Sequence, residues 1–132
     1  MVRAIGAALA QAGLAPSAVD FVSAHGTGTP FNDAMEARAL VRVFGERGVT
    51  VNGIKGAIGH TLGAAGAFEA VVCVETIARG VVPPTAGLRE IDPACAGLDL
   101  VCDEPRSQDA RVAVSTSSGF AGANAALVLG RA

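Results

Sequence analysis

The spacing of apolar residues along the chain predicts where its helices and strands lie. Ile5, Leu9 and Ala12 recur at helical spacing within residues 3–13, and Gly13 is a natural stop. Short apolar runs bounded by glycine, proline and polar residues are typical of buried strands. On these grounds we expect helices over 34–44 and 64–79, the first capped by Asn32 or Asp33, and strands over 19–24, 49–54, 98–102, 111–115 and 125–129.

The order of these elements predicts an α/β domain. Strands and helices alternate as far as residue 79 and strands follow, which favours a mixed sheet with flanking helices. The segment 81–97 is expected to be mostly loop, because it holds Pro83-Pro84 and Asp92-Pro93. A chain of 132 residues without internal repeats is large enough for one core, so we expect a single domain over 1–132.

The expected helix at 64–79 is apolar on nearly every side. Between Ala64 and Ala78 only Glu69, Glu75 and Thr76 are polar, and a helix of this kind is normally buried on more than one face. The whole chain is 51% hydrophobic and only 17% charged, against about 25% charged in an average soluble domain. We therefore expect part of the apolar surface to belong against a further layer.

Charge and targeting signals exclude several classes of protein. The net charge of −2 gives no basic surface for nucleic acid. No apolar run approaches the ~20 residues of a membrane span, and the amino terminus lacks a secretory pattern. The three cysteines, at irregular spacing, form no disulfide framework and no zinc-finger pair, so we expect no metal and a reducing cytoplasm.

The candidate catalytic and ligand-binding residues follow two of the expected strands. The two histidines both lie in glycine-bearing loops, His25 in His-Gly-Thr-Gly-Thr and His60 five residues after Lys55. Ligands of α/β sheets bind where such loops converge. Each residue also has a structural interpretation: an imidazole bonded to backbone, a solvated lysine, and, for Thr27 and Thr29, hydroxyls that cap local turns.

Several segments, in order along the chain, resemble the β-ketoacyl-acyl carrier protein synthases of fatty acid and polyketide synthesis. The first, Val19 to Pro30, contains His-Gly-Thr-Gly-Thr, and the second, Lys55 to Ala67, reads Lys-Gly-Ala-Ile-Gly-His-Thr-Leu-Gly-Ala-Ala-Gly-Ala. The other matching residues are Asn32-Asp33 with Glu36, Glu69-Ala70, Pro83-Pro84-Thr85 and Ser118 to Ala125. The chain resembles the carboxyl-terminal half of such a ketosynthase.

The resemblance implies a thiolase-like half-fold, with the helix at 64–79 in a middle layer between two similar halves. It implies a decarboxylative Claisen condensation of malonyl-acyl carrier protein with a cysteine-bound acyl chain. In this family two histidines, here His25 and His60, hydrogen-bond the malonyl thioester carbonyl. Lys55 matches the active-site lysine, and Glu69 matches the glutamate that supports it.

The resemblance also assigns binding residues and partners. Thr27 and Thr29 match threonines that contact the phosphopantetheine arm, and Phe120 matches a gating phenylalanine. The expected partners are acyl carrier protein, which brings the arm, and the amino-terminal ketosynthase half, with a dimer when complete. No other cofactor is implied.

The sequence departs from the family in two ways. The gating loop usually reads Gly-Phe-Gly-Gly, but Ala121 replaces the second of these glycines, and alanine tolerates positive φ poorly. None of Cys73, Cys95 or Cys102 lies in the small-residue turn of the family's nucleophile, so we expect the chain to be inactive alone. A non-catalytic fragment that only pairs with a ketosynthase-like partner is the alternative; a coenzyme A-dependent thiolase fits His-Gly-Thr-Gly-Thr less well.

Overall fold

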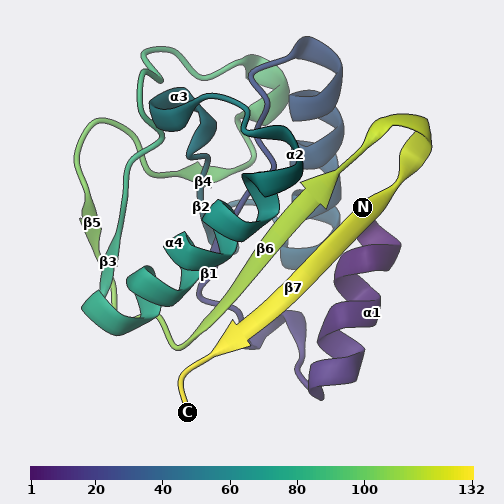
Figure 1. The fold of residues 1–132 in the computed structure, drawn as a ribbon, viewed down its shortest axis with the longest axis vertical. Helices are drawn as coiled ribbons and strands as arrows, with labels where there is room; N and C mark the ends of the chain where they lie inside the picture. The colour runs from purple at the N-terminus through teal and green to yellow at the C-terminus, as the bar shows by residue number, and fades with distance from the viewer.

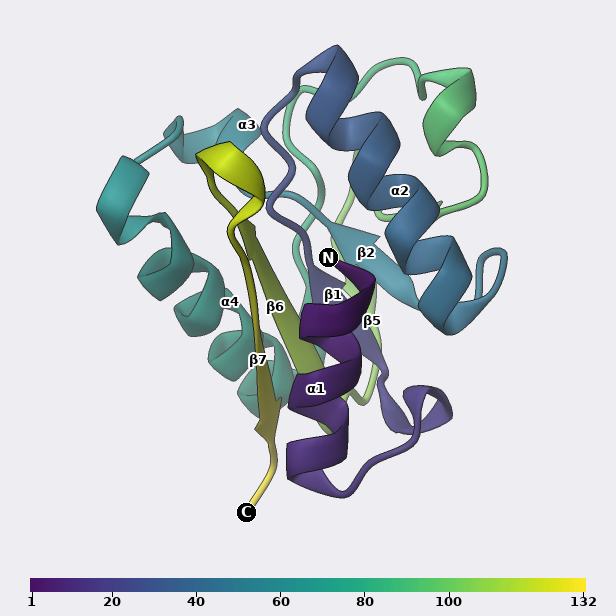
Figure 2. The ribbon, with the colours of Figure 1, turned by 90° about the vertical axis from the view of Figure 1, so that its right-hand side faces the viewer.

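The computed structural model describes all residues from 1 to 132 and has three layers, with one sheet between two sets of helices (Figures 1 and 2). The sheet has the strand order β4-β2-β1-β6-β7, in which only β7 runs antiparallel to its neighbour. Its strands are β1 (Phe21–Ser23), β2 (Thr50–Asn52), β4 (Asp99–Leu100), β6 (Val112–Ser118) and β7 (Asn124–Gly130). This is the mixed α/β arrangement that the element order predicts.

The helices cover both faces of the sheet. They are α1 (Val2–Ala12), α2 (Pro30–Phe44), α3 (Lys55–Ile58) and α4 (Ala65–Arg79), and 3-10 turns lie at Pro16–Ala18, Leu62–Ala64, Pro93–Cys95 and Phe120–Gly122. Figure 2 shows α1 and α2 on one face and α4 alone on the other. Successive side chains of a strand point to opposite faces, so Val22 of β1 packs in the α1–α2 core and Phe21 packs beneath α4.

Two helix ends illustrate where the sequence prediction is right and where it is wrong. Gly13 ends α1 in the left-handed conformation, at φ 68°, as its position predicts. The predicted cap of the next helix is wrong: Thr29 is the N-cap of α2, and Asn32 and Asp33 lie within the first turn. Pro30 accounts for the earlier start, because a proline at the first helical position loses no intrahelical hydrogen bond.

Short elements are the other differences from the sequence prediction. Lys55 lies on the one-turn helix α3 and not in an irregular loop. The two-residue strands β3 (Val81–Val82) and β5 (Arg106–Ser107) pair antiparallel and are not visible in the apolar pattern. A two-residue strand is too short to establish an alternation of apolar and polar positions.

Helix α4 is covered on one side only within residues 1–132. Its buried side includes Glu69 and Cys73 and packs on the sheet. On the opposite side Phe68, Val71 and Val74 are 48%, 57% and 50% exposed. Part of the apolar surplus of the sequence thus lies on one uncovered helix face. None of the helices is both long and apolar enough to cross a lipid bilayer.

Candidate active site

The candidate site lies at the carboxyl-terminal ends of the three central strands. His25 follows β1, Lys55 begins α3 directly after β2, and Ser117 lies at the end of β6. Because β1, β2 and β6 are parallel, these ends meet at one edge of the sheet. Residues that are up to 92 positions apart therefore come together.

The two histidines contact each other directly. The rings of His25 and His60 are in an edge-to-face arrangement with centroids 5.5 Å apart. His25 is buried, whereas His60 is exposed on the surface formed by residues 1–132. The backbone N–H of Leu62 donates to Nδ1 of His60 at 3.1 Å. Since Nδ1 accepts, a neutral His60 carries its proton on Nε2.

His25 is held in the same tautomer by a different group. Nζ of Lys55 lies 3.4 Å from Nδ1 of His25, and an ammonium group can only donate. Burial, reinforced by the Lys55 charge, holds the pKa of His25 below its ordinary value, so its imidazole is neutral at neutral pH. The two rings in contact can thus each offer an Nε2–H donor, which suits an oxygen that gains negative charge.

Lys55 forms an ion pair with Glu69 of α4, and it also donates to the backbone carbonyl of His25. The side chains of Lys55 and Glu69 are only 6% and 0% exposed, so the solvated-lysine interpretation is wrong. Ser117 Oγ donates to Oε2 of Glu69 at 3.4 Å. Burial raises the pKa of Glu69, and the hydrogen bond from Lys55 opposes that rise.

Glu36 is a site residue to which the sequence prediction gave no role. Its Oε1 accepts from the His25 N–H at 2.9 Å and from Thr116 Oγ1 at 2.7 Å, while its Oε2 accepts from the Gly26 N–H at 2.9 Å. These bonds fix the backbone that carries His25. The sequence could have indicated this role, because Glu36 lies on the same buried face as Ala37 and Leu40, where a carboxylate needs hydrogen-bond partners.

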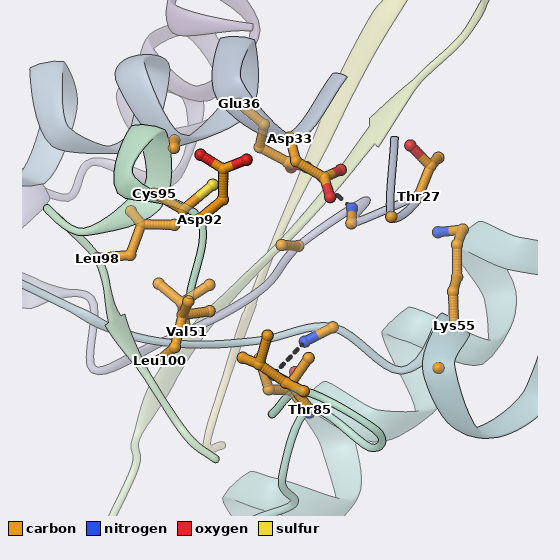
Figure 3. A pocket seen from close by; sticks show the side chains of 18 of the residues that line it. Thr27, Asp33, Glu36, Val51, Lys55, Thr85, Asp92, Cys95, Leu98 and Leu100 are labelled. Carbon is orange, nitrogen blue, oxygen red and sulfur yellow. Dashed lines mark hydrogen bonds between the residues drawn. The ribbon is translucent and has the colours of Figure 1, made fainter. Parts of the chain in front are cut away.

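A pocket of about 640 Å³ opens beside this cluster, between α2, α3 and the loop that follows β3. Figure 3 shows Thr27, Asp33, Lys55 and Thr85 around it. The hydroxyls of Thr27 and Thr29 lie 2.8 Å apart and hydrogen-bond to each other, and both residues line the pocket. The two threonines are therefore placed together beside Lys55 and His60, as residues for an extended ligand would be.

Gly56 fixes how closely α3 approaches that loop. A Cβ at this position would lie 2.0 Å from the carbonyl oxygen of Ala86, which is an impossible contact. Only glycine therefore allows Lys55 and the wall of the pocket to approach so closely.

The structure does not bring Phe120 into this cluster. Its side chain is fully exposed, on a 3-10 turn between β6 and β7. Ala121, the departure from the glycine pattern, is in the left-handed conformation at φ 60° and ψ 22°. The loop therefore keeps the backbone conformation that favours glycine, although the residue is alanine.

None of the three cysteines is placed as a nucleophile. Cys73 lies fully buried on the side of α4 that faces the sheet, and burial raises the pKa of its thiol to about 12. Burial also raises the pKa of Cys95, and Sγ of Cys102, which follows β4, contacts the carbonyl of Leu100 at 3.7 Å. A reactive thiolate needs positive charge and access. No group of three or more histidine, cysteine, aspartate or glutamate side chains is arranged to hold a metal ion.

Comparison with known proteins identifies the family. The family model for the β-ketoacyl synthase C-terminal domain matches residues 1–89. The chain is 47% identical over 126 residues to nodulation protein E of Rhizobium sp. strain N33 and 44% identical over 125 residues to 3-oxoacyl-[acyl-carrier-protein] synthase 2 of Coxiella burnetii. These matches cover 94% and 93% of this chain but 31% and 30% of those proteins.

Solved structures agree with this result. The ishigamide ketosynthase/chain length factor superposes with a TM-score of 0.95 at 43% identity, and the match covers 99% of this chain and 32% of that one. A type II polyketide ketosynthase in complex with its acyl carrier protein superposes with a TM-score of 0.94 at 36% identity, over 99% of this chain and 32% of that one. The fold is thiolase-like, and the chain spans about a third of the length of its relatives. The chain belongs to the β-ketoacyl synthase family, where it corresponds to the carboxyl-terminal part of a ketosynthase.

Proposed function

We propose that residues 1–132 form the carboxyl-terminal half of a β-ketoacyl-acyl carrier protein synthase. The reaction is the decarboxylative Claisen condensation of malonyl-acyl carrier protein with an acyl chain held on a cysteine, in fatty acid or polyketide synthesis. The observation that carries this proposal is the pair of histidines in contact, His25 and His60, whose Nδ1 atoms each face a hydrogen-bond donor.

The proposed chemistry begins when the thioester carbonyl of the malonyl group accepts hydrogen bonds from the two Nε2–H groups. The bond to the carboxylate carbon breaks, carbon dioxide leaves, and the electron pair passes into an enolate whose oxygen the two donors stabilise. The enolate carbon then attacks the acyl thioester, forming a carbon–carbon bond and releasing the cysteine thiolate. The decarboxylation part of this sequence is assigned to residues of this chain.

Lys55 and Glu69 act on His25 in this proposal. The ammonium group of Lys55 donates to the His25 carbonyl and lies beside Nδ1, which fixes the position and the tautomer of the ring. Glu69 holds Lys55 in place. Thr27 and Thr29 line the pocket and are assigned to the amides of the phosphopantetheine arm.

The acyl-carrying thiol comes from outside residues 1–132 in this proposal. Cys73 and Cys95 are buried with raised pKa values, and Sγ of Cys102 contacts the Leu100 carbonyl. We therefore assign the chain the malonyl side of a site that the amino-terminal half completes, and we expect no condensation by the chain alone.

The test combines the chain with a matching amino-terminal ketosynthase half and measures condensation of malonyl-acyl carrier protein. His25→Ala and His60→Ala should each abolish product formation, with a loss of about 100-fold or more, typical for removal of an oxyanion donor. An exposed substitution remote from the site, Arg111→Ala, is the control. Full activity of both histidine variants would refute the assigned roles.

The uncovered face of α4 supports a second candidate, a non-catalytic fragment that pairs with a ketosynthase-like partner. Phe68, Val71 and Val74 provide an apolar surface for such pairing without any chemistry. This candidate predicts association with the amino-terminal half without turnover, so the same mixture distinguishes the two functions.

A further inference from the structure

The pocket beside the two histidines has a second end that the proposed chemistry does not use. Figure 3 shows Thr27 and Lys55 at one end and Cys95, Leu98 and Val51 at the other. We call the second end the Cys95 end. Its lining residues, which come from α2, β2, β4 and the 3-10 turn beside β4, are Ala37, Leu40, Val51, Cys95, Leu98 and Leu100.

The walls of the Cys95 end suit the apolar body of a small molecule. All of its lining side chains are aliphatic except the thiol of Cys95, which is buried and behaves as a small apolar group. The whole pocket holds about 640 Å³. Small-molecule sites typically measure ~300–1,000 Å³ and are mostly apolar, with a few polar groups that orient the ligand. The polar groups of this pocket therefore indicate which ligand it favours.

The charge around the Cys95 end is negative. Asp33, Glu90 and Asp92 line the pocket, and none of them forms an ion pair within the chain. Lys55 is the only lysine or arginine in the lining, and it is already paired with Glu69. Burial is the main cause of the raised pKa of the Cys95 thiol, and the charges of Asp33 and Asp92 add to it. The negative potential thus extends to the apolar walls, where it favours a cation.

A buried acceptor in the same pocket lacks a hydrogen-bond partner. Asn52 lines the pocket and is 0% exposed, and its Nδ2 donates to the Pro83 carbonyl at 3.1 Å. Its Oδ1, which can only accept, has no partner within the chain. Buried polar atoms without partners are uncommon in folded proteins. The carboxylates and this amide oxygen therefore both favour a ligand that donates hydrogen bonds.

We propose that the Cys95 end is a binding site for a small organic cation, an alkylammonium or arylammonium compound. The ammonium group binds the carboxylates of Asp33 and Asp92, and the apolar body packs against Val51, Leu98 and Cys95. The binding site does not depend on the proposed function, because none of these residues is assigned to condensation. A consequence does rest on that function: Thr27 and Thr29 line the same pocket, so a bound cation obstructs the phosphopantetheine arm.

The test measures binding of octylamine, octanol and octanoate to the protein that contains residues 1–132, by isothermal titration calorimetry. The three probes share an alkyl chain and differ in charge. Octylamine should bind most tightly, and octanoate should not bind detectably. Asp33→Asn with Asp92→Asn should weaken octylamine binding by about three- to tenfold and leave octanol binding unchanged. Asparagine keeps the shape of both side chains and can still cap the 3-10 turn that Asp92 caps.

Substitutions of Cys95 test the apolar half of the site. Cys95→Met fills part of the space and should weaken the binding of octylamine and octanol alike, whereas Cys95→Ala should retain the binding of both. The matched control is Asp103→Asn with Glu104→Gln, which removes the same charge from two exposed residues outside the pocket. It should leave the binding of every probe unchanged. Circular dichroism and thermal melting confirm that each variant is folded.

The proposal is overturned if octylamine does not bind the parent protein or if octanoate binds as tightly. It is also overturned if the Asp33–Asp92 variant binds octylamine no more weakly than the control does, or if a folded Cys95→Met variant binds both probes normally. In the mixture with the amino-terminal half, octylamine should raise the KM for malonyl-acyl carrier protein. An unchanged KM despite binding would refute the role assigned to Thr27 and Thr29 and leave the cation site intact.

Discussion

Lys55 of α3 and Glu69 of α4 form a buried ion pair, which holds together the two ends of the segment that contains His60. The two residues are 14 positions apart, and each end of the segment is anchored by one charge of the pair. The same ammonium group contacts His25, so a single lysine connects His25 to α4. The pair is therefore a structural support and also part of the electrostatic environment of the site.

Removing the carboxylate from this pair should destabilise the fold. Glu69→Gln leaves the Lys55 ammonium buried without a counterion, so we expect the free energy of unfolding to fall by about 3–5 kcal/mol. Urea denaturation measures this change. Glu75→Gln is the control on the same helix, because the Glu75–Arg79 pair is exposed and should matter little. Equal effects of the two substitutions would contradict a structural role for the buried pair.

The pH dependence of stability should reflect the lowered pKa of His25. The unfolded chain binds a proton near the ordinary value of 6.5, whereas the folded chain keeps His25 neutral to lower pH, chiefly because the ring is buried. Unfolding therefore takes up a proton in this window, and the free energy of unfolding should decrease as pH falls below about 6.5. His25→Gln should flatten this dependence in urea titrations at pH 5.5 and 7.5.

The titration of the His25 imidazole can be observed directly by NMR. The chain has two histidines, so the His60→Gln variant shows the imidazole signals of His25 alone. Its midpoint should lie below 6.5. The neighbouring charge of Lys55 contributes to this shift, so Lys55→Met should move the midpoint upwards. A midpoint above 6.5 in the otherwise native chain would show that burial and the Lys55 charge do not determine the pKa of His25.

Glu36 should act as a positioning residue. In Glu36→Gln one carboxylate oxygen becomes an NH₂ group that faces a backbone N–H or the Thr116 hydroxyl, so at least one buried hydrogen bond is lost. We expect a loss of about 1–3 kcal/mol in stability and faster hydrogen exchange at the His25 and Gly26 amides. When the chain is combined with a matching amino-terminal half, we expect a lower kcat with little change in KM. Unchanged exchange at these amides would show that the loop does not depend on Glu36.

Ala121 has a left-handed backbone conformation, and a substitution at this position should stabilise the fold instead of weakening it. Ala121→Gly should stabilise the fold by up to about 1 kcal/mol, because glycine adopts positive φ without the Cβ contact that alanine makes. The control is Ala123→Gly, where the extended backbone at φ −65° gives glycine no advantage. Thermal melting should show an increase for the first variant and none for the second.

The isolated chain should associate with itself through α4. Phe68, Val71 and Val74 form an exposed apolar face, and surfaces of this kind drive association in water. Sedimentation of residues 1–132 should reveal concentration-dependent oligomers, and Val71→Glu with Val74→Lys should reduce them. A monodisperse, thermally stable parent monomer would show that the α4 face needs no further layer.

Most of the long elements and the chemical cluster could be predicted from the sequence. Gly13 and the apolar run of α4 are local signals, and they lie where the pattern places them. The local pattern around Lys55 did not reveal its burial, because this depends on Glu69 from another helix, and only the family resemblance paired the two residues. Glu36 was missed for the same reason: its partners are defined by tertiary contacts up to 80 residues away.

The bond between the His25 backbone and Thr116 spans 91 residues and has a consequence for folding during synthesis. The central strand β1 pairs with β6, so Phe21 leaves the ribosome long before its partner Ala113 is made. Long-range parallel pairing is slow to form because a large loop must first close. The sheet edge that carries the candidate site is thus among the last parts of the chain to become ordered, and slow synthesis near β6 should leave newly made chains open to proteases and chaperones.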